Sequence, residues 1–136
     1  MNAKEYLMQA KNIDNRINTK LERLGSLHSL ATKTTSTLSD MPHSSSPNLK
    51  QMESTVCKLM DMEKEINTDI DKLIDLKREI AVAVEGVSDE EERTVLELRY
   101  LDFHGWSDIA TRMSCSINTV YRIHRSALKN IKVDSE

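Results

Sequence analysis

The chain contains few of the residues on which sheets, disulfide frameworks and membrane spans depend. Its 136 residues include 3 Gly, 2 Pro and 2 Cys, and aromatic residues make up 4%. This scarcity of turn-forming and aromatic side chains argues against a β-rich fold. The two cysteines, Cys57 and Cys115, support neither a disulfide framework nor a zinc site. No apolar run reaches the roughly 18 residues of a membrane span, and we expect no signal peptide. The sequence therefore predicts a cytoplasmic, all-α protein without a membrane partner.

Charge is sorted along the chain. Lys and Arg together number 19 and Asp and Glu 22, and the net charge of -3 excludes a uniformly basic nucleic-acid-binding surface. Residues 88–111 carry seven acidic and two basic residues, whereas residues 112–132 carry five basic residues and no acidic one. The end of the chain can therefore form a local cationic patch.

Two long amphipathic stretches precede this region. From about Ala3 to about Thr32, apolar residues recur at alternating steps of three and four, as in a coiled-coil seam, and the alternation resumes from Leu49 to Val84. The first predicted seam comprises Leu7, Ala10, Asp14, Ile17, Leu21, Leu24, His28 and Ala31. The second comprises Leu49, Met52, Val56, Leu59, Glu63, Ile66, Ile70, Leu73, Lys77, Ile80 and Val84. Residues 33–48, rich in Thr, Ser and Pro, are predicted to be a connector.

A single long helix cannot bury such a seam. The first helix can fold back on the second as an antiparallel hairpin, a second copy of the chain can supply the partner, or both can happen. We therefore assign residues 1–87 to a helical hairpin or coiled-coil oligomerisation region, and residues 88–136 to a small C-terminal domain. A homo-oligomer is expected, with a dimer favoured.

The C-terminal domain has the pattern of a helix-turn-helix. Ser88, with Glu91 three residues later, predicts a capped helix that ends near Asp102. A short helix over residues 106–113, a turn at 114–116 and a last helix over residues 117–131 with Ser116 as its N-cap complete the pattern. The polar side of the last helix carries Asn118, Tyr121, Arg122, Arg125 and Lys129. A helix about 10 Å wide fits the major groove of B-DNA, which is about 12 Å wide, so we expect this side to contact double-stranded DNA.

The same residues resemble a known family. Residues 91–132, EERTVLELRYLDFHGWSDIATRMSCSINTVYRIHRSALKNIK, resemble region four of the sigma-70 class of transcription factors. The resemblance lies in the opening E-R-x-V-L-x-L-R-Y, the D/E-I-A helix and the ending S-x-x-T-V-x-R-x-x-x-x-A-L. The chain as a whole is similar to short phage and prophage proteins of Gram-positive bacteria, related in their C-terminal domains to late-operon activators of the RinA and ArpU type. The rest of a housekeeping sigma factor is missing, so the resemblance implies a promoter-reading module that acts alone in the cytoplasm of a bacterial host cell.

The resemblance also implies roles for individual residues. By motif position, the residues that read bases are Ile117, Asn118, Tyr121 and Arg122, and those near phosphate are Ser116, Thr119 and Arg125. Charge and rough position alone predict phosphate contacts for Arg125, Lys129 and Lys132. Arg112 is also predicted to contact phosphate. Ser114 stands at a turn position that is often Gly in this motif, because Gly tolerates positive φ most easily.

We expect a sequence-specific transcriptional regulator of phage type, not an enzyme. The sequence shows no catalytic constellation, no residues at metal-binding spacing and no phosphate-binding loop, so no cofactor is expected. His124 is expected to be an exposed polar residue, with an approach to a phosphate as the alternative. Host RNA polymerase is a second candidate partner besides DNA. Two alternatives stay open: a DNA-packaging recognition subunit of the small-terminase kind, and a protein that binds polymerase or a sigma factor without contacting DNA.

Overall fold

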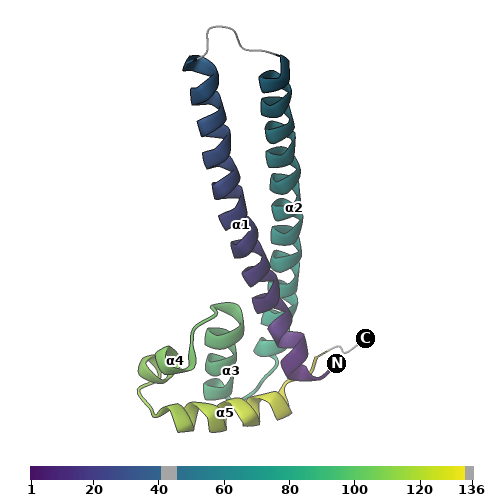
Figure 1. Cartoon of the computed structure of the whole chain (residues 1–136). Coiled ribbons are helices and arrows are strands. Elements are labelled where there is room, and N and C mark those ends of the chain that lie inside the picture. Colours follow the sequence, from purple (N-terminus) through teal and green to yellow (C-terminus); the bar gives the residue numbers. More distant parts are fainter. Residues whose placement is uncertain (41–45, 134–136) are drawn as a thin grey trace. The chain divides into compact units, whose positions relative to one another are not determined.

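A computed structural model describes the backbone of residues 1–40 and 46–133, and the side chains of residues 1–33 and 49–133. Within these residues every regular element is helical, which confirms the predicted all-α class (Figure 1). None of the described helices has a stretch long and apolar enough to cross a bilayer. The elements are α1 (Ala3–Asp40), α2 (Ser46–Glu85), α3 (Glu90–Leu96), the π-helical turn η1 (Glu97–Leu101), α4 (Trp106–Arg112) and α5 (Ile117–Asn130).

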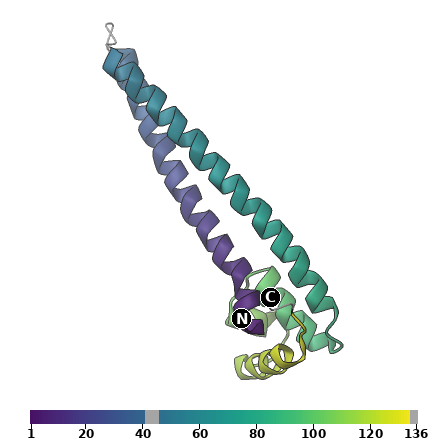
Figure 2. The ribbon, with the colours of Figure 1, turned by 90° about the vertical axis from the view of Figure 1, so that its right-hand side faces the viewer.

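The chain packs as two compact units. The larger unit comprises Met1–Asp14 and Lys72–Glu136, and the smaller unit comprises Asn15–Asp71. The larger unit therefore contains the first turns of α1, the last turns of α2 and the short helices α3, α4 and α5 (Figures 1 and 2). The C-terminal helices share a core with residues from outside the predicted domain of residues 88–136.

In the smaller unit, α1 and α2 run side by side in opposite directions (Figures 1 and 2). One row of side chains on each helix is buried or half-buried. These rows consist of Ile17, Lys20, Leu24, Leu27 and Ala31 on α1, and of Met52, Thr55, Leu59, Met62, Ile66 and Asp69 on α2. The hairpin that the sequence left open as one alternative is therefore present within a single chain.

Part of each predicted seam is wrong. Leu21 and His28 on α1, and Leu49, Val56, Glu63 and Ile70 on α2, are exposed instead of buried. From a correctly predicted seam position, the residue three positions along and the residue four positions along lie on opposite flanks of the buried stripe. The prediction followed the apolar residues, which at these positions lie on the exposed flank. The inward flank was overlooked because it carries polar residues, which are Lys20, Thr55 and Asp69.

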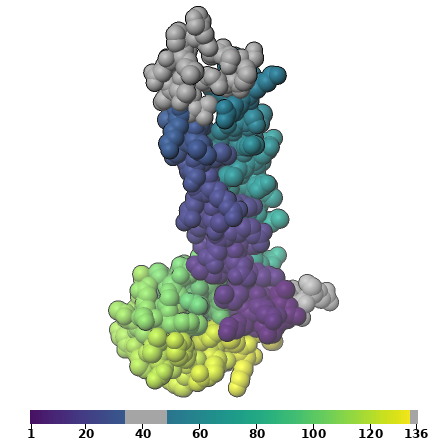
Figure 3. Space-filling view, viewed as in Figure 1, coloured from purple at the N-terminus to yellow at the C-terminus, as the bar shows by residue number. Residues whose placement is uncertain are grey.

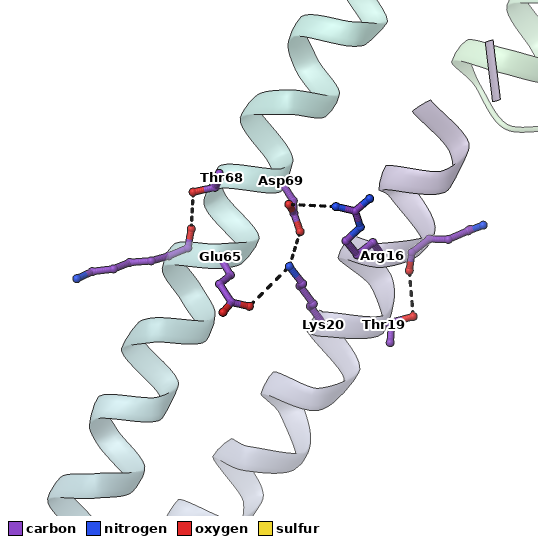
Figure 4. A network of polar contacts seen from close by, with 8 residues as sticks. Arg16, Thr19, Lys20, Glu65, Thr68 and Asp69 are labelled. Atoms are coloured by element: carbon purple, nitrogen blue, oxygen red, sulfur yellow. Dashed lines mark hydrogen bonds and ion pairs between the residues drawn. The ribbon is translucent and has the colours of Figure 1, made fainter. Parts of the chain in front are cut away.

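An ion pair allows polar residues to occupy this seam. Lys20 Nζ donates a hydrogen bond to Asp69 Oδ2 at 2.7 Å and lies 3.6 Å from Glu65 Oε2 (Figure 4). Arg16 Nη1 lies 3.9 Å from Asp69 Oδ1. The Asp69 residue is only 4% exposed. A carboxylate at this depth is tolerated because it is paired with cations.

The predicted connector of residues 33–48 is too long. Helix α1 continues to Asp40 and helix α2 begins at Ser46, so the part of the connector that can still lie between the helices is residues 41–45, which are outside the described residues. Thr and Ser lower helix propensity by only a few tenths of a kcal/mol each, which is too little to end a long helix. Pro47 falls in the first turn of α2, where its missing N–H leaves no helical hydrogen bond unmade.

Two apolar clusters form the core of the larger unit. The first joins the beginning of α1 and the end of α2 to α3, η1 and the C-terminal end of α5, and contains Leu7, Ala10, Ile80, Val84, Val87, Leu96, Tyr100, Ala127 and Ile131. The second joins α3, α4 and α5, and contains Val95, Ile109, Ala110, Val120 and Ile123. Because α5 contributes to both clusters, one side of this helix is buried along most of its length.

The predicted helix that ends near Asp102 is divided in two. Asp89, not Ser88, caps α3, since its Oδ1 accepts a hydrogen bond from the Glu92 N–H at 3.0 Å. Both Ser and Asp are good caps, so the sequence did not fix the start to one residue. After Leu96 the helix widens into η1, where the Asp102 N–H donates to the Glu97 carbonyl at 3.0 Å.

We expect Asp69→Ala to lower the free energy of unfolding by about 1 to 3 kcal/mol, because it leaves the partly buried Lys20 ammonium without its closest partner. The double variant Lys20→Met/Asp69→Leu should recover most of this loss. Glu65→Ala, at an exposed position, is the matched control and should cost at most about 0.5 kcal/mol. Denaturant unfolding of the full chain measures all three, and equal losses for Asp69→Ala and Glu65→Ala would contradict the assignment.

Candidate functional site

Helices α4 and α5 are joined by a tight turn. The Ser114 N–H donates to the Thr111 carbonyl at 3.2 Å, and the Cys115 N–H donates to the Ala110 carbonyl at 3.1 Å, a pair of bonds that closes the end of α4. This geometry requires a left-handed residue, and Ser114 adopts φ 55 in spite of its side chain. Ser116 then caps α5 as predicted, because its Oγ accepts a hydrogen bond from the Thr119 N–H at 3.2 Å.

One side of α5, which we call the outer face, is exposed to solvent. Successive residues of an α-helix are rotated by about 100° around its axis, so the five residues of the outer face, named below, lie within an arc of about 100°. Atoms of α4 and α5, drawn in yellow-green and yellow, lie at the surface in the space-filling view (Figure 3). The helix contains no acidic residue. The outer face consists of Asn118, Tyr121, Arg122, Arg125 and Lys129.

The other predicted site residues lie around the ends of α5. Ser116 and Lys132 are exposed, whereas Ile117 and Thr119 are half-buried. The Thr119 hydroxyl lies 2.9 Å from the Ser116 hydroxyl, so both take part in the cap of the helix. The half-buried Ile117 packs against the second apolar cluster, which limits the part of it that faces solvent.

A buried carboxylate holds one flank of α5. Glu92 of α3 is 7% exposed and accepts hydrogen bonds from the Ser126 hydroxyl and from the Asn130 amide, whose Nδ2 lies 2.9 Å from Oε2 and 3.1 Å from Oε1. Ser126 and Asn130 are one turn apart, so the contact fixes the rotation of α5 about its axis. The sequence alone does not indicate this role, because Glu92 is one of three acidic residues in the first turn of α3.

An aromatic cluster holds the opposite flank. The Trp106 ring contacts the Tyr121 ring edge-on, with centroids 5.4 Å apart, and the Arg99 guanidinium lies 4.3 Å from the centroid of the Trp106 ring. Such edge-to-face and cation–π contacts each contribute about 0.5 to 1.5 kcal/mol. Tyr121, 36% exposed, therefore stands at the edge of the outer face with its ring position fixed by Trp106.

His124 is buried, contrary to the prediction of an exposed polar residue. It is 7% exposed, and its Nε2 lies 2.6 Å from the Tyr100 hydroxyl. Burial lowers the pKa of the His124 imidazole to about 4, assisted by the positive charges of Lys4, Arg99 and Arg125. Burial also raises the pKa of the Tyr100 hydroxyl to about 12, while Arg99 acts in the opposite direction. Both groups are uncharged at neutral pH, so His124 adds no positive charge to α5.

Arg112 differs from the other predicted cations because it is paired. Its Nε lies 3.2 Å from Asp108 Oδ2, and the same oxygen lies 2.7 Å from His104 Nδ1. An anionic ligand at Arg112 would compete with Asp108. The described side chains contain no group of three or more His, Cys, Asp or Glu placed to bind a metal ion.

Comparison with known proteins identifies one family. A family model described as "Protein of unknown function (DUF1492)" matches residues 48–132, which include most of α2 and all of α3, α4 and α5. No curated protein matches the chain, and no solved structure matches it.

We expect Ser114→Gly to raise the free energy of unfolding by about 0.5 to 1 kcal/mol, because Gly adopts the left-handed conformation without the strain of a Cβ atom. Ser107→Gly, inside α4, is the matched control and should lower it by about 0.5 kcal/mol. Urea unfolding measures both variants. Destabilisation by Ser114→Gly equal to that by Ser107→Gly would show that the turn is not strained.

The full chain should lose stability as the pH falls from about 6.5 to about 4. Unfolded His124 titrates near 6.5 and folded His124 near 4, so within this window only the unfolded state takes up the proton. The free energy of unfolding should then fall by about 1.4 kcal/mol per pH unit, and this contribution should be constant below pH 4.

Urea unfolding of the wild type and of His124→Gln at a series of pH values isolates this contribution from that of the carboxylates. The difference between the two curves should change across the window and be flat above it. Parallel curves from pH 4 to pH 7 would contradict the assignment of a buried neutral imidazole.

Proposed function

Since this chain belongs to the DUF1492 family, which is associated with phages, we propose that it is a sequence-specific DNA-binding transcriptional regulator. In this proposal α5 lies in the major groove of promoter DNA in the cytoplasm of a bacterial host. The observation that carries the proposal is the outer face of α5, which is exposed, cationic and free of acidic residues.

The arrangement of α4 and α5 supports a groove-binding role. A short helix, a tight turn and a second helix with an exposed polar side is the geometry in which the second helix enters the major groove and the first crosses the backbone. The flanks of α5 are held by Glu92 on one side and Trp106 on the other. Since a groove-binding helix must present a fixed set of side chains, these two contacts prepare α5 for recognition before DNA is bound.

The chemistry of the outer face supports base recognition near the start of α5. Arg recognises guanine through its O6 and N7 atoms, and Asn recognises adenine through N6 and N7, each by two parallel hydrogen bonds. Arg122 and Asn118 are exposed and one turn apart, so they can reach neighbouring base pairs. Tyr121 and Ile117 are the further base contacts in this proposal, and the Trp106 contact sets the direction of the Tyr121 ring.

The remaining cations of the outer face suit phosphate. Arg125 and Lys129 are exposed beyond Arg122 along α5, and Lys132 is exposed just after its end. Ser116 and Thr119, near the helix N-terminus, complete the proposed phosphate contacts together with Arg112, which must release Asp108. If one domain neutralises about four phosphates, the logarithm of the binding constant should fall with the logarithm of the salt concentration with a slope of about -3.6. A slope of this size is expected for a single DNA-binding domain of modest affinity.

A role in transcription, rather than in another process on DNA, follows from the resemblance of residues 91–132 to sigma-70 region four. These residues include α3 from its second residue onward and the whole of η1, α4 and α5. In sigma-like modules the last helix reads promoter DNA. Of the base-reading positions of that motif, Asn118, Tyr121 and Arg122 are on the outer face here, whereas Ile117 packs partly against the second apolar cluster.

We expect Arg122→Ala to weaken binding to the cognate site by about 1 to 3 kcal/mol and to relax preference at one base pair. Lys129→Ala should weaken binding to all sequences similarly and reduce the magnitude of the salt slope by about one. Fluorescence anisotropy with promoter fragments, first selected by DNA capture from cells that express the protein, measures both effects over a range of salt concentrations.

Lys58→Ala is the matched control, because Lys58 is an exposed cation of α2 in the smaller unit. It should leave the affinity and the salt slope unchanged. The proposal fails if Arg122→Ala and Lys129→Ala bind as the wild type does, or if the captured DNA contains no enriched promoter.

A further inference from the structure

Helix α2 carries a second stripe whose large apolar residues are exposed. Its large apolar members are Leu49, Val56, Met60, Ile70 and Ile74, whose exposed fractions run from 37% to 53%. Together with the polar residues that lie between them, they recur at alternating steps of four and three along one unbroken helix. At about 100° per residue, the stripe lies about 100° around the helix from the buried row of α2. We call it the α2 stripe, and its full sequence is Leu49, Glu53, Val56, Met60, Glu63, Asn67, Ile70, Ile74, Lys77 and Ala81.

We propose that the α2 stripe binds the α2 stripe of a second copy of this chain, with the two helices antiparallel. When the stripe is paired with a second copy of itself that runs in the opposite direction, residues of like polarity face each other. In an antiparallel pair centred near residue 65, Met60 of one copy faces Ile70 of the other, and Glu63 faces Asn67. Continued along α2, the same register places Val56 opposite Ile74 and Leu49 opposite the half-buried Ala81. It also places Glu53 opposite Lys77, which is half-buried and whose Nζ lies 4.6 Å from the Phe103 ring centroid in its own chain. Every apolar residue then meets an apolar one, and every polar residue meets a polar one.

Other arrangements of the same stripe are less favourable. In a parallel pair each residue faces its own copy, so Glu53, Glu63 and Lys77 would each meet a like charge. A shift of the antiparallel register by one heptad would place Glu53 opposite Ile70 and Glu63 opposite Met60, which buries carboxylates against apolar side chains. The residue order of α2 therefore selects one direction and one register.

The charges beside the stripe fit the same register. Lys64 and Asp71 follow Glu63 and Ile70 in the chain and are both exposed. In the antiparallel pair, Lys64 of each copy comes within reach of Asp71 of the other, so two opposite-charge contacts flank the centre of the interface. Within its own chain Glu63 lies 3.9 Å from His28 Nε2 and keeps half of its side chain exposed, which leaves it accessible to a partner amide.

Sedimentation equilibrium of the full chain, without DNA, tests the proposal independently of any role on DNA. The wild type should have about twice the chain mass of 15.5 kDa. Met60→Glu/Ile70→Glu should raise the dissociation constant at least about 100-fold, because it introduces charge into both central apolar layers. Leu21→Glu, which changes an exposed apolar residue of α1 outside the stripe, is the matched control and should leave the dimer intact.

A charge-reversal cycle tests the direction and register with variants that alter only exposed residues. Lys64→Asp and Asp71→Lys should each raise the dissociation constant about tenfold, and the double variant should return it to within about threefold of the wild type. Circular dichroism checks that each variant retains its helices. A monomeric wild type, a dimer indifferent to Met60→Glu/Ile70→Glu, a larger assembly, or a double variant weaker than both single variants would overturn the proposal.

Discussion

The rotation of α5 about its axis depends most directly on the buried carboxylate of Glu92. Ser126 and Asn130 each donate to it, and a helix held at two points one turn apart cannot turn without leaving a buried charge unsatisfied. Such a loss would cost about 1 to 3 kcal/mol or more. Apolar contacts from Val120 and Ile123 bring α5 to the core, but they tolerate small rotations that hydrogen bonds do not. The direction in which Arg122 points is therefore set by a residue on a different helix.

The sequence predicted the helical class and most of the bounds of α4 and α5 with the turn between them, because those features are local. The Ser116 cap, the turn at 114–116 and the apolar side of α5 follow from residue types within a few positions of one another. The seam between α1 and α2 was predicted only in part. Lys20 and Asp69 belong to it because they pair across 49 residues of chain, and no periodicity of apolar residues within one helix can reveal such a pair.

Contacts between helices, which the periodicity of one helix cannot reveal, also explain the roles around α5 that the sequence did not predict. His124 has the spacing of a flank residue, and its burial depends on Tyr100 of η1 and Trp106 of α4, which close over it. Glu92 and Trp106 likewise act through partners on α5. The roles of these residues depend on packing between helices. Spacing along the sequence identifies which residues share a helix side but not which helix covers that side.

Because η1 is a π-helical turn, the number of residues in Glu97–Leu101 matters for the fold as much as their identity. A π-helical turn accommodates about one residue more than an α-helical turn. Deletion of one residue between Glu97 and Leu101 would allow regular α-helix to continue, and every later residue would rotate by about 100° around the axis. Tyr100 would then leave His124, and Phe103, which carries a positive φ of 61 at the exit, would no longer lie near Lys11 and Lys77. Insertions and deletions should therefore be tolerated far less here than conservative replacements of the same side chains.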